Sequence, residues 1–331
     1  MRNSERRPID FFREEARPQW GDRIRNQLYI RRLWRIEPKI ESVQEFERLL
    51  RLTSRTLGLK TALPDEEELL DLLKKDDSTI PEAVARKVKD SDDLPGYINF
   101  FIRSVQNSKE DIIVRINSAL LLGKLGQPSP QAVNALLSAL TDGSALVRAR
   151  GTKALGELGD SSPKVISALS SALKDENLGV RWCAAEALGI SGQPSSEIIN
   201  TLISARKDED WIVRGTVLWA LGKLGRSTPQ VISTVTEALK DEDYLVRWNA
   251  TEALGLLNEV SSGVINGLIS ALKDKHPHVR DGAAAALVEL GQSSPEEVAK
   301  MLQEELSKEQ DVDVKEKIQS IITNITKTQR Q

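Results

Sequence analysis

Residues 174–192 read KDENLGVRWCAAEALGISG, and residues 207–225 read KDEDWIVRGTVLWALGKLG. The two stretches align without a gap at a spacing of 33 residues, and residues 240–258 (KDEDYLVRWNATEALGLLN) continue the series. A fixed period of this length is typical of proteins in which each repeated unit is a pair of helices. The sequence therefore predicts an α-solenoid.

The most regular element of the repeat is a Val-Arg pair. Its six copies, each 33 residues after the last, are Val114-Arg115, Val147-Arg148, Val180-Arg181, Val213-Arg214, Val246-Arg247 and Val279-Arg280. A Leu follows seven residues after each Arg, and a Gly follows that Leu in five of the six copies. A single unit is too small to bury enough apolar surface alone, so we expect stacking between neighbouring units to stabilise the array.

Polar caps divide each unit into two helices, A and B. Helix B is predicted to begin after residues whose side-chain oxygens can cap a helix, namely Asp111, Ser144, Asn177, Asp210 and Asp243. In the sixth unit His276 stands at this place. Helix B is predicted to end at residues that favour the left-handed conformation, namely Gly126, Gly159, Gly192, Gly225, Asn258 and Gly291.

An Asp stands six residues before five of the repeated Arg residues. The five Asp/Arg sets are Asp142/Arg148, Asp175/Arg181, Asp208/Arg214, Asp241/Arg247 and Asp274/Arg280. A row of acid–base pairs could carry chemistry, but a feature present in nearly every unit is more typical of a scaffold. We therefore interpret these residues as a structural ladder that ties the turn between the two helices to helix B.

The predicted fold class is all-α, a superhelical α/α solenoid of helix pairs with a small helical N-terminal cap. About seven pairs are expected over residues 94–325, followed by a tail at 326–331. Residues 1–93 do not follow the repeat. We expect a basic, helical region there, with residues 41–107 packed on the first unit and residues 1–20 loosely ordered.

The Asp-to-Val-Arg spacing, the Ala-Leu-Gly after it and the Ser/Thr-Pro start of the next helix resemble HEAT-like repeats of the phycobilisome-lyase type. Similar arrays accompany bacterial NACHT-type signalling proteins. The resemblance implies the fold, and it leaves the function open because this repeat serves unrelated proteins. One function it implies is that of a bilin lyase subunit or phycobiliprotein chaperone.

Charge and composition narrow the remaining functions. Residues 1–60 carry a net charge of +6 and the rest of the chain −9, so nucleic-acid binding is plausible only through residues 1–60. A single cysteine, Cys183, and the lack of a secretory or membrane-spanning segment favour a cytoplasmic protein. Because the sequence shows no phosphate loop, no metal-ligand cluster and no catalytic constellation, we expect no cofactor, no metal and no enzymatic activity.

Aromatic side chains supply the candidate binding site. Trp182 and Trp248 follow the repeated Arg by one residue and Trp219 follows it by five, which places them on one stripe of helix B. In the resembling family that stripe lines the concave surface. With Trp211, Tyr244, Arg150 and Glu186, these residues form a predicted partner-binding patch, although some of the rings could instead fill gaps between helices. The sequence thus favours a protein-interaction scaffold or sensor.

Overall fold

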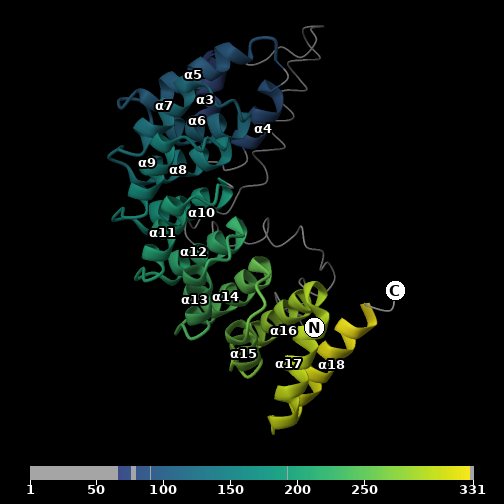
Figure 1. Cartoon of the computed structure of the whole chain (residues 1–331). Helices are drawn as coiled ribbons and strands as arrows, with labels where there is room; N and C mark the ends of the chain where they lie inside the picture. The colour runs from purple at the N-terminus through teal and green to yellow at the C-terminus, as the bar shows by residue number, and fades with distance from the viewer. Residues whose placement is uncertain (1–65, 76–79, 90, 192, 329–331) are drawn as a thin grey trace, which may run out of the picture. The chain divides into compact units, whose positions relative to one another are not determined.

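The computed structural model describes residues 66–75, 80–89, 91–191 and 193–328. These residues form sixteen helices and no strand (Figure 1), which confirms the all-α prediction. The helices are α3 (Glu66–Leu73), α4 (Ile80–Val88), α5 (Leu94–Gln106), α6 (Ile112–Leu125), α7 (Pro130–Ala139), α8 (Ala145–Leu158), α9 (Pro163–Ala172), α10 (Leu178–Ile190), α11 (Ser196–Ala205), α12 (Trp211–Leu224), α13 (Pro229–Ala238), α14 (Tyr244–Leu257), α15 (Ser262–Ala271), α16 (Pro277–Ser293), α17 (Pro295–Lys308) and α18 (Val312–Thr328).

Helices α5 to α18 form seven consecutive pairs, with odd-numbered helices as A and even-numbered helices as B. Successive B helices from α6 to α16 pack on one another most extensively, and the A helices form a second row beside them (Figure 1). Helix α18 ends at Thr328, so residues 326–328 belong to this helix rather than to a tail. The expectations for residues 1–65, including the loose segment 1–20, lie outside the described residues. No helix of the described segments combines the length and hydrophobicity needed to span a membrane.

Small residues bring the B helices close together. A Cβ added to Gly156 of α8 would lie 2.7 Å from the Cα of Ala187 in α10, and one added to Gly222 of α12 would lie 2.8 Å from the Cα of Ala253 in α14. Contacts this short leave no room for a side chain, which explains the Gly after the repeated Leu. In the sixth unit the tight contact moves to Gly291, because a Cβ there would clash with Ile325 of α18.

The predicted caps are mostly present. The Asp111, Asn177, Asp210 and Asp243 side chains accept hydrogen bonds from the first turn of their B helices, whereas the Ser144 side chain makes no such bond. The residues after α6, α8, α12 and α14 adopt the left-handed conformation. The prediction for Gly291 was wrong: it lies inside α16, which continues to Ser293.

The repeated Arg residues join neighbouring units. Nε and Nη2 of Arg181 donate to the two carboxylate oxygens of Asp208 at 2.8 and 3.0 Å, and Asp208 belongs to the next unit. Nη1 of Arg181 donates to the backbone carbonyl of Asp175 in its own unit at 3.0 Å. The same arrangement recurs at Arg148–Asp175, Arg214–Asp241 and Arg247–Asp274, and Arg115 pairs with Asp142. The ladder therefore runs between units, with each carboxylate 27 residues after its Arg.

Each ladder Asp also shapes its own turn. Oδ1 of Asp208 accepts the backbone N–H of Asp210 at 2.9 Å, and Asp175 does the same for Asn177 at 2.8 Å. Burial alone would raise the pKa of Asp175, but the hydrogen bonds from Arg148 and the Asn177 backbone lower it below its usual value. The carboxylate is therefore held ionised between two units.

The N-terminal end of the array is covered by α3 and α4, which both pack on α6. The Asn117 side chain donates to the backbone carbonyl of Leu73 at 2.9 Å, and Lys124 lies 2.7 Å from Glu82. These contacts agree with the expectation that helices before residue 94 cover the first unit. The part of that expectation that concerns residues 41–65 lies outside the described residues.

At the C-terminal end the ladder changes partner. Glu309 stands six residues before Lys315 and takes the place of the ladder Asp, but it lies 2.5 Å from Lys273 instead of meeting Arg280. The hydrogen bond from Lys273 lowers the pKa of Glu309 to about 2. Helix α17 has 14 residues, whereas α15 has 10, so the turn after α17 is displaced from Arg280.

We predict that Asp208→Ala lowers the free energy of unfolding by about 3 kcal/mol, because it leaves the buried Arg181 guanidinium without its carboxylate. The matched control is the neighbouring Glu209→Ala. The Glu209 carboxylate also reaches Arg181, at 3.2 Å, but its side chain is 86% exposed. This control should cost less than about 0.5 kcal/mol. Urea unfolding followed by circular dichroism measures both, and equal losses would contradict the ladder's role.

Candidate functional site

The predicted stripe of aromatic side chains is only partly accessible. Trp219 and Trp248 are partly buried, but Trp182 is 3% exposed and Glu186 is 5% exposed. The prediction that these two residues belong to an exposed patch was therefore wrong. Helix α10 is buried continuously from Gly179 to Gly189, so in this unit the stripe is not a surface.

Long side chains from both neighbouring helices explain why α10 is covered. On one side, the ring of Trp219 in α12 lies over Gly189, where an added Cβ would stand 3.0 Å from the ring atom Cζ3. On the other side, Arg150 and Lys153 of α8 lie close enough to Cys183 to influence its titration. Trp248 behaves like Trp219, because a Cβ added to Gly282 of α16 would lie 2.9 Å from its ring. Each of these indoles thus rests on a glycine of the neighbouring helix.

Cys183 lies at the centre of this covered region. It is 2% exposed, and burial together with the nearby Glu186 charge raises the pKa of its thiol to about 12. A thiol of this kind stays protonated at neutral pH and is a poor nucleophile. Of the charged residues predicted for the patch, Glu186 is buried and Arg150 is partly buried, so neither belongs to an open surface around Cys183.

Tyr244 contacts the next unit. Its ring stacks on His276 with the centroids 3.6 Å apart and the planes 22° apart, and His276 in turn lies 5.2 Å from His278. The Nδ1 atom of His276 is buried and has no hydrogen-bond partner in the described part of the chain. Burial, followed by the His278 charge, lowers the pKa of His276. Trp211 occupies the equivalent place one unit earlier and is also partly buried.

Two exposed aliphatic side chains complete the surface, and the sequence analysis missed them. Ile190 of α10 is 44% exposed and Leu256 of α14 is 51% exposed. They stand 66 residues apart, which is two repeat periods, and Lys223 of α12 occupies the position between them. The other units place Lys124, Glu157 and Glu289 at this register. An apolar residue at a position that is charged elsewhere is the signal that could have identified them.

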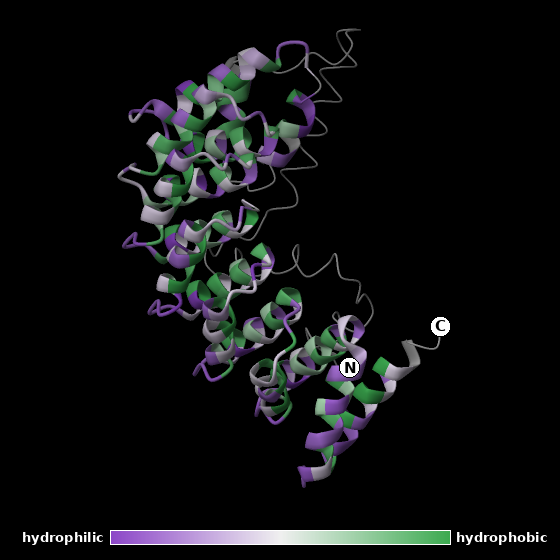
Figure 2. Cartoon of the chain, in the orientation of Figure 1, coloured by the Kyte–Doolittle hydropathy of each residue, from purple (hydrophilic) through white to green (hydrophobic). Residues whose placement is uncertain are grey.

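We name the surface formed by Ile190, Trp219, Lys223, Trp248 and Leu256 the B-face patch. All five residues come from the consecutive B helices α10, α12 and α14, whose close stacking sets their spacing. Figure 2 shows that hydrophobic residues are frequent along these helices, whereas the turns between helices are mostly hydrophilic. Exposed apolar residues next to partly buried indoles and charged neighbours are typical of a protein-binding surface rather than a reaction centre. Within the described residues, no group of three metal-binding side chains is present.

We predict that Trp182→Ala destabilises the fold by about 3–5 kcal/mol, because it empties a buried site. Trp219→Ala removes a partly exposed ring and should cost no more than about 2 kcal/mol. Chemical unfolding of the two variants under the same conditions measures the difference. An equal loss would mean that Trp219 is as much a core residue as Trp182.

The free energy of unfolding should also depend on pH through the ionisation of His276. Because the pKa of His276 is lowered in the folded state, folding favours the neutral ring, and its contribution is fully present only above the unfolded pKa of about 6.5. The free energy of unfolding should therefore fall between pH 7.5 and 5.5. His276→Asn, which places a side chain that does not titrate at the start of α16, should flatten this part of the profile. A profile that the substitution leaves unchanged would assign the effect to other groups.

The comparisons with known proteins agree with this architecture. The family model for HEAT repeats matches residues 133–198, 199–263 and 237–322, which together exceed half of the chain. The model for the PBS lyase HEAT-like repeat matches residues 114–142. No curated protein sequence matches the chain.

Several solved structures superpose on this chain, and the two below with TM-scores above 0.5 show the same fold. The Escherichia coli protein YibA superposes with a TM-score of 0.56 at 24% identity, covering 80% of this chain and 93% of YibA. The karyopherin Kap121p superposes with a TM-score of 0.53 at 14% identity, over 75% of this chain and 32% of Kap121p. The CpcE–CpcF complex of phycocyanin lyase from Nostoc gives a TM-score of 0.45 at 22% identity, over 69% of this chain and 94% of that one. By its repeat period, its helix pairs and the matching family model, the chain belongs to the HEAT-repeat family.

Proposed function

We propose that this chain is a non-catalytic scaffold that binds a protein partner across the B-face patch. The observation that carries the proposal is the exposure of Ile190 and Leu256 on either side of the partly buried Trp219. Transfer of exposed aliphatic surface out of water favours association, and Trp is the residue most enriched among those that dominate binding energy. Lys223 lies between the two aliphatic residues in the register and supplies charge for specificity.

Comparison of the repeat units favours a binding role for Ile190 and Leu256 over a structural role. A residue needed for the fold would recur in every unit, as the ladder Asp and Arg nearly do. The apolar residues at positions 190 and 256 instead replace the charged residues of other units. The lyase alternative has less support, because the matching PBS-lyase repeat covers residues 114–142 and contains none of the patch residues.

The proposal can be tested by substituting the two aliphatic residues with the charged residues that other units carry at the same register, since the fold already accepts those residues there. Ile190→Glu copies Glu157 and Leu256→Lys copies Lys223, so the double variant should retain its free energy of unfolding within about 0.5 kcal/mol. We predict that proteins captured from cells by the intact chain are depleted at least ten-fold with the double variant, as judged by quantitative mass spectrometry.

Ser167→Glu, on the exposed surface of α9 in the A-helix row, is the control and should leave capture unchanged. Capture of the same proteins at the same levels by the double variant would contradict the assignment of the patch. Failure of the intact chain to capture any protein reproducibly would count against the scaffold function itself.

A further inference from the structure

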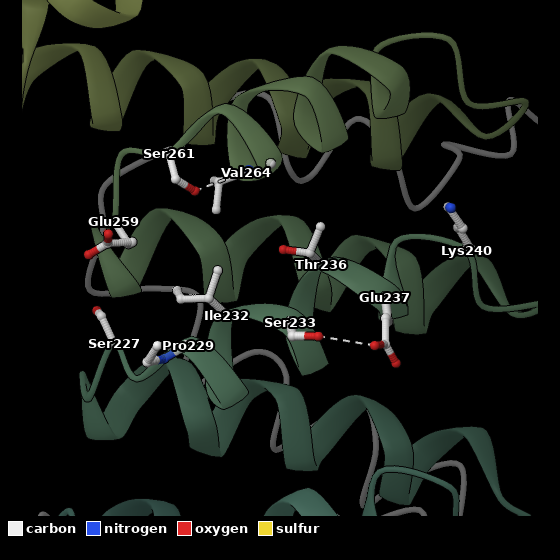
Figure 3. A pocket seen from close by; sticks show the side chains of 11 residues that line it. Ser227, Pro229, Ile232, Ser233, Thr236, Glu237, Lys240, Glu259, Ser261 and Val264 are labelled. Atoms are coloured by element: carbon white, nitrogen blue, oxygen red, sulfur yellow. Dashed lines mark hydrogen bonds between the residues drawn. The ribbon is translucent and has the colours of Figure 1, made fainter.

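A concave surface lies on the A-helix row, between α13 and α15. It encloses about 530 Å³ (Figure 3), which is within the range of roughly 300–1,000 Å³ typical of ligand clefts. Ile232 and Thr236 of α13 face Val264 of α15 across the opening, with Pro229 at one end. These residues do not belong to the B-face patch, so the groove is separate from the surface proposed above.

A single departure from the repeat opens this groove. Gly263 stands where the other A helices from α7 to α17 carry a long polar side chain: Gln131, Lys164, Glu197, Gln230 and Glu296. Gly263 lines the groove, and a Cβ added to it would have no atom within 4 Å, so a side chain at this position would extend into open space beside the groove. One turn later the two helices meet, because a Cβ added to Gly267 would lie 3.0 Å from Leu239 and 3.3 Å from Thr236.

The groove contains polar groups that an occupant could satisfy. The Oγ1 atom of Thr236 is buried and has no hydrogen-bond partner in the described part of the chain. Glu259 lies at one end of the groove, and Glu237 and Lys240 lie at the other (Figure 3). Glu237 already accepts a hydrogen bond from Ser233 at 3.1 Å and lies 3.2 Å from Arg206. The end at Glu259 therefore carries negative charge that no lining cation balances.

We propose that this groove binds an extended peptide segment of a partner protein, with an apolar side chain against Pro229 and Ile232 and a Lys or Arg beside Glu259. An extended chain is favoured over a helix because its main-chain N–H and C=O groups are free to bond to Thr236, whereas those of a helix bond to one another. The Thr236 hydroxyl would bond to the main chain of the peptide. The charge of Glu259 selects a basic residue over an acidic one.

Selection from a phage-displayed library of random dodecapeptides against the intact 331-residue chain tests the proposal. Peptides that are enriched should share an apolar residue next to Lys or Arg. Gly263→Gln, which places at this position the residue of α7 and α13, should weaken their binding at least ten-fold while leaving thermal unfolding unchanged. Glu259→Lys should remove the preference for the basic residue.

Two further variants keep the outcome decisive. Thr236→Val retains the shape of the side chain and removes the hydroxyl, so it should weaken peptide binding. This variant provides a test even if Gly263→Gln folds poorly. Trp219→Ala, on the B-face patch, should leave peptide binding unaffected. This result is expected whether or not the scaffold proposal holds. Recovery of no consensus, of acidic peptides, or of peptides that bind Gly263→Gln and Thr236→Val as tightly as the intact chain would overturn the proposal.

Discussion

The array depends on one repeated interaction, in which the guanidinium of an Arg forms hydrogen bonds with two neighbouring units at once. In each interior Arg, Nη1 donates to carbonyl groups of the turn in its own unit. Nε and Nη2 donate two parallel hydrogen bonds to the Asp carboxylate in the turn of the next unit. Five donors in a rigid plane make Arg suited to this double role, which Lys cannot reproduce. The side chains of Arg181 and Asp208 are only 9% and 10% exposed, so their attraction is much less screened than that of a surface pair. Because each Asp also holds its own turn, the helix-pair connection and the stacking of units are fixed by the same residues.

We call this Arg–Asp interaction between units the clamp. Given the clamp, the two rows of helices contribute differently to the structure. Along the B row, Gly and Ala bring the backbones together, and large side chains at the remaining positions cover the neighbours, as Trp219 covers Gly189. Along the A row, contacts between successive helices are sparse, so the exchange of one long side chain for Gly263 opens a groove without disturbing the ladder. The positions outside the clamp and the Gly–Ala contacts are therefore the ones at which units can differ, and both binding surfaces proposed here lie at such positions.

The sequence was sufficient to predict the class of fold, the period, most helix ends and the residues of the ladder, because each of these repeats in register and has a local cause. It did not predict which Asp each Arg meets, since a 33-residue period makes partners six residues before and 27 residues after equally regular. It did not predict that Trp182 is buried while Ile190 and Leu256 are exposed, because burial on a shared stripe depends on side chains from two neighbouring helices. The shift of Gly291 from helix end to close contact follows from the packing of α18, which departs from the repeat.

The central claim is that each ladder Arg meets the carboxylate of the next unit, whereas it holds its own turn only through backbone carbonyl groups. A pair of double-mutant cycles on the free energy of unfolding tests it most directly, with Arg181→Met combined first with Asp208→Ala and then with Asp175→Ala. Residues in direct contact show coupling of about 0.5–3 kcal/mol, so the account predicts about 2 kcal/mol for Arg181 with Asp208 and less than about 0.5 kcal/mol for Arg181 with Asp175. The reverse order, or equal coupling in the two cycles, would contradict a clamp between units.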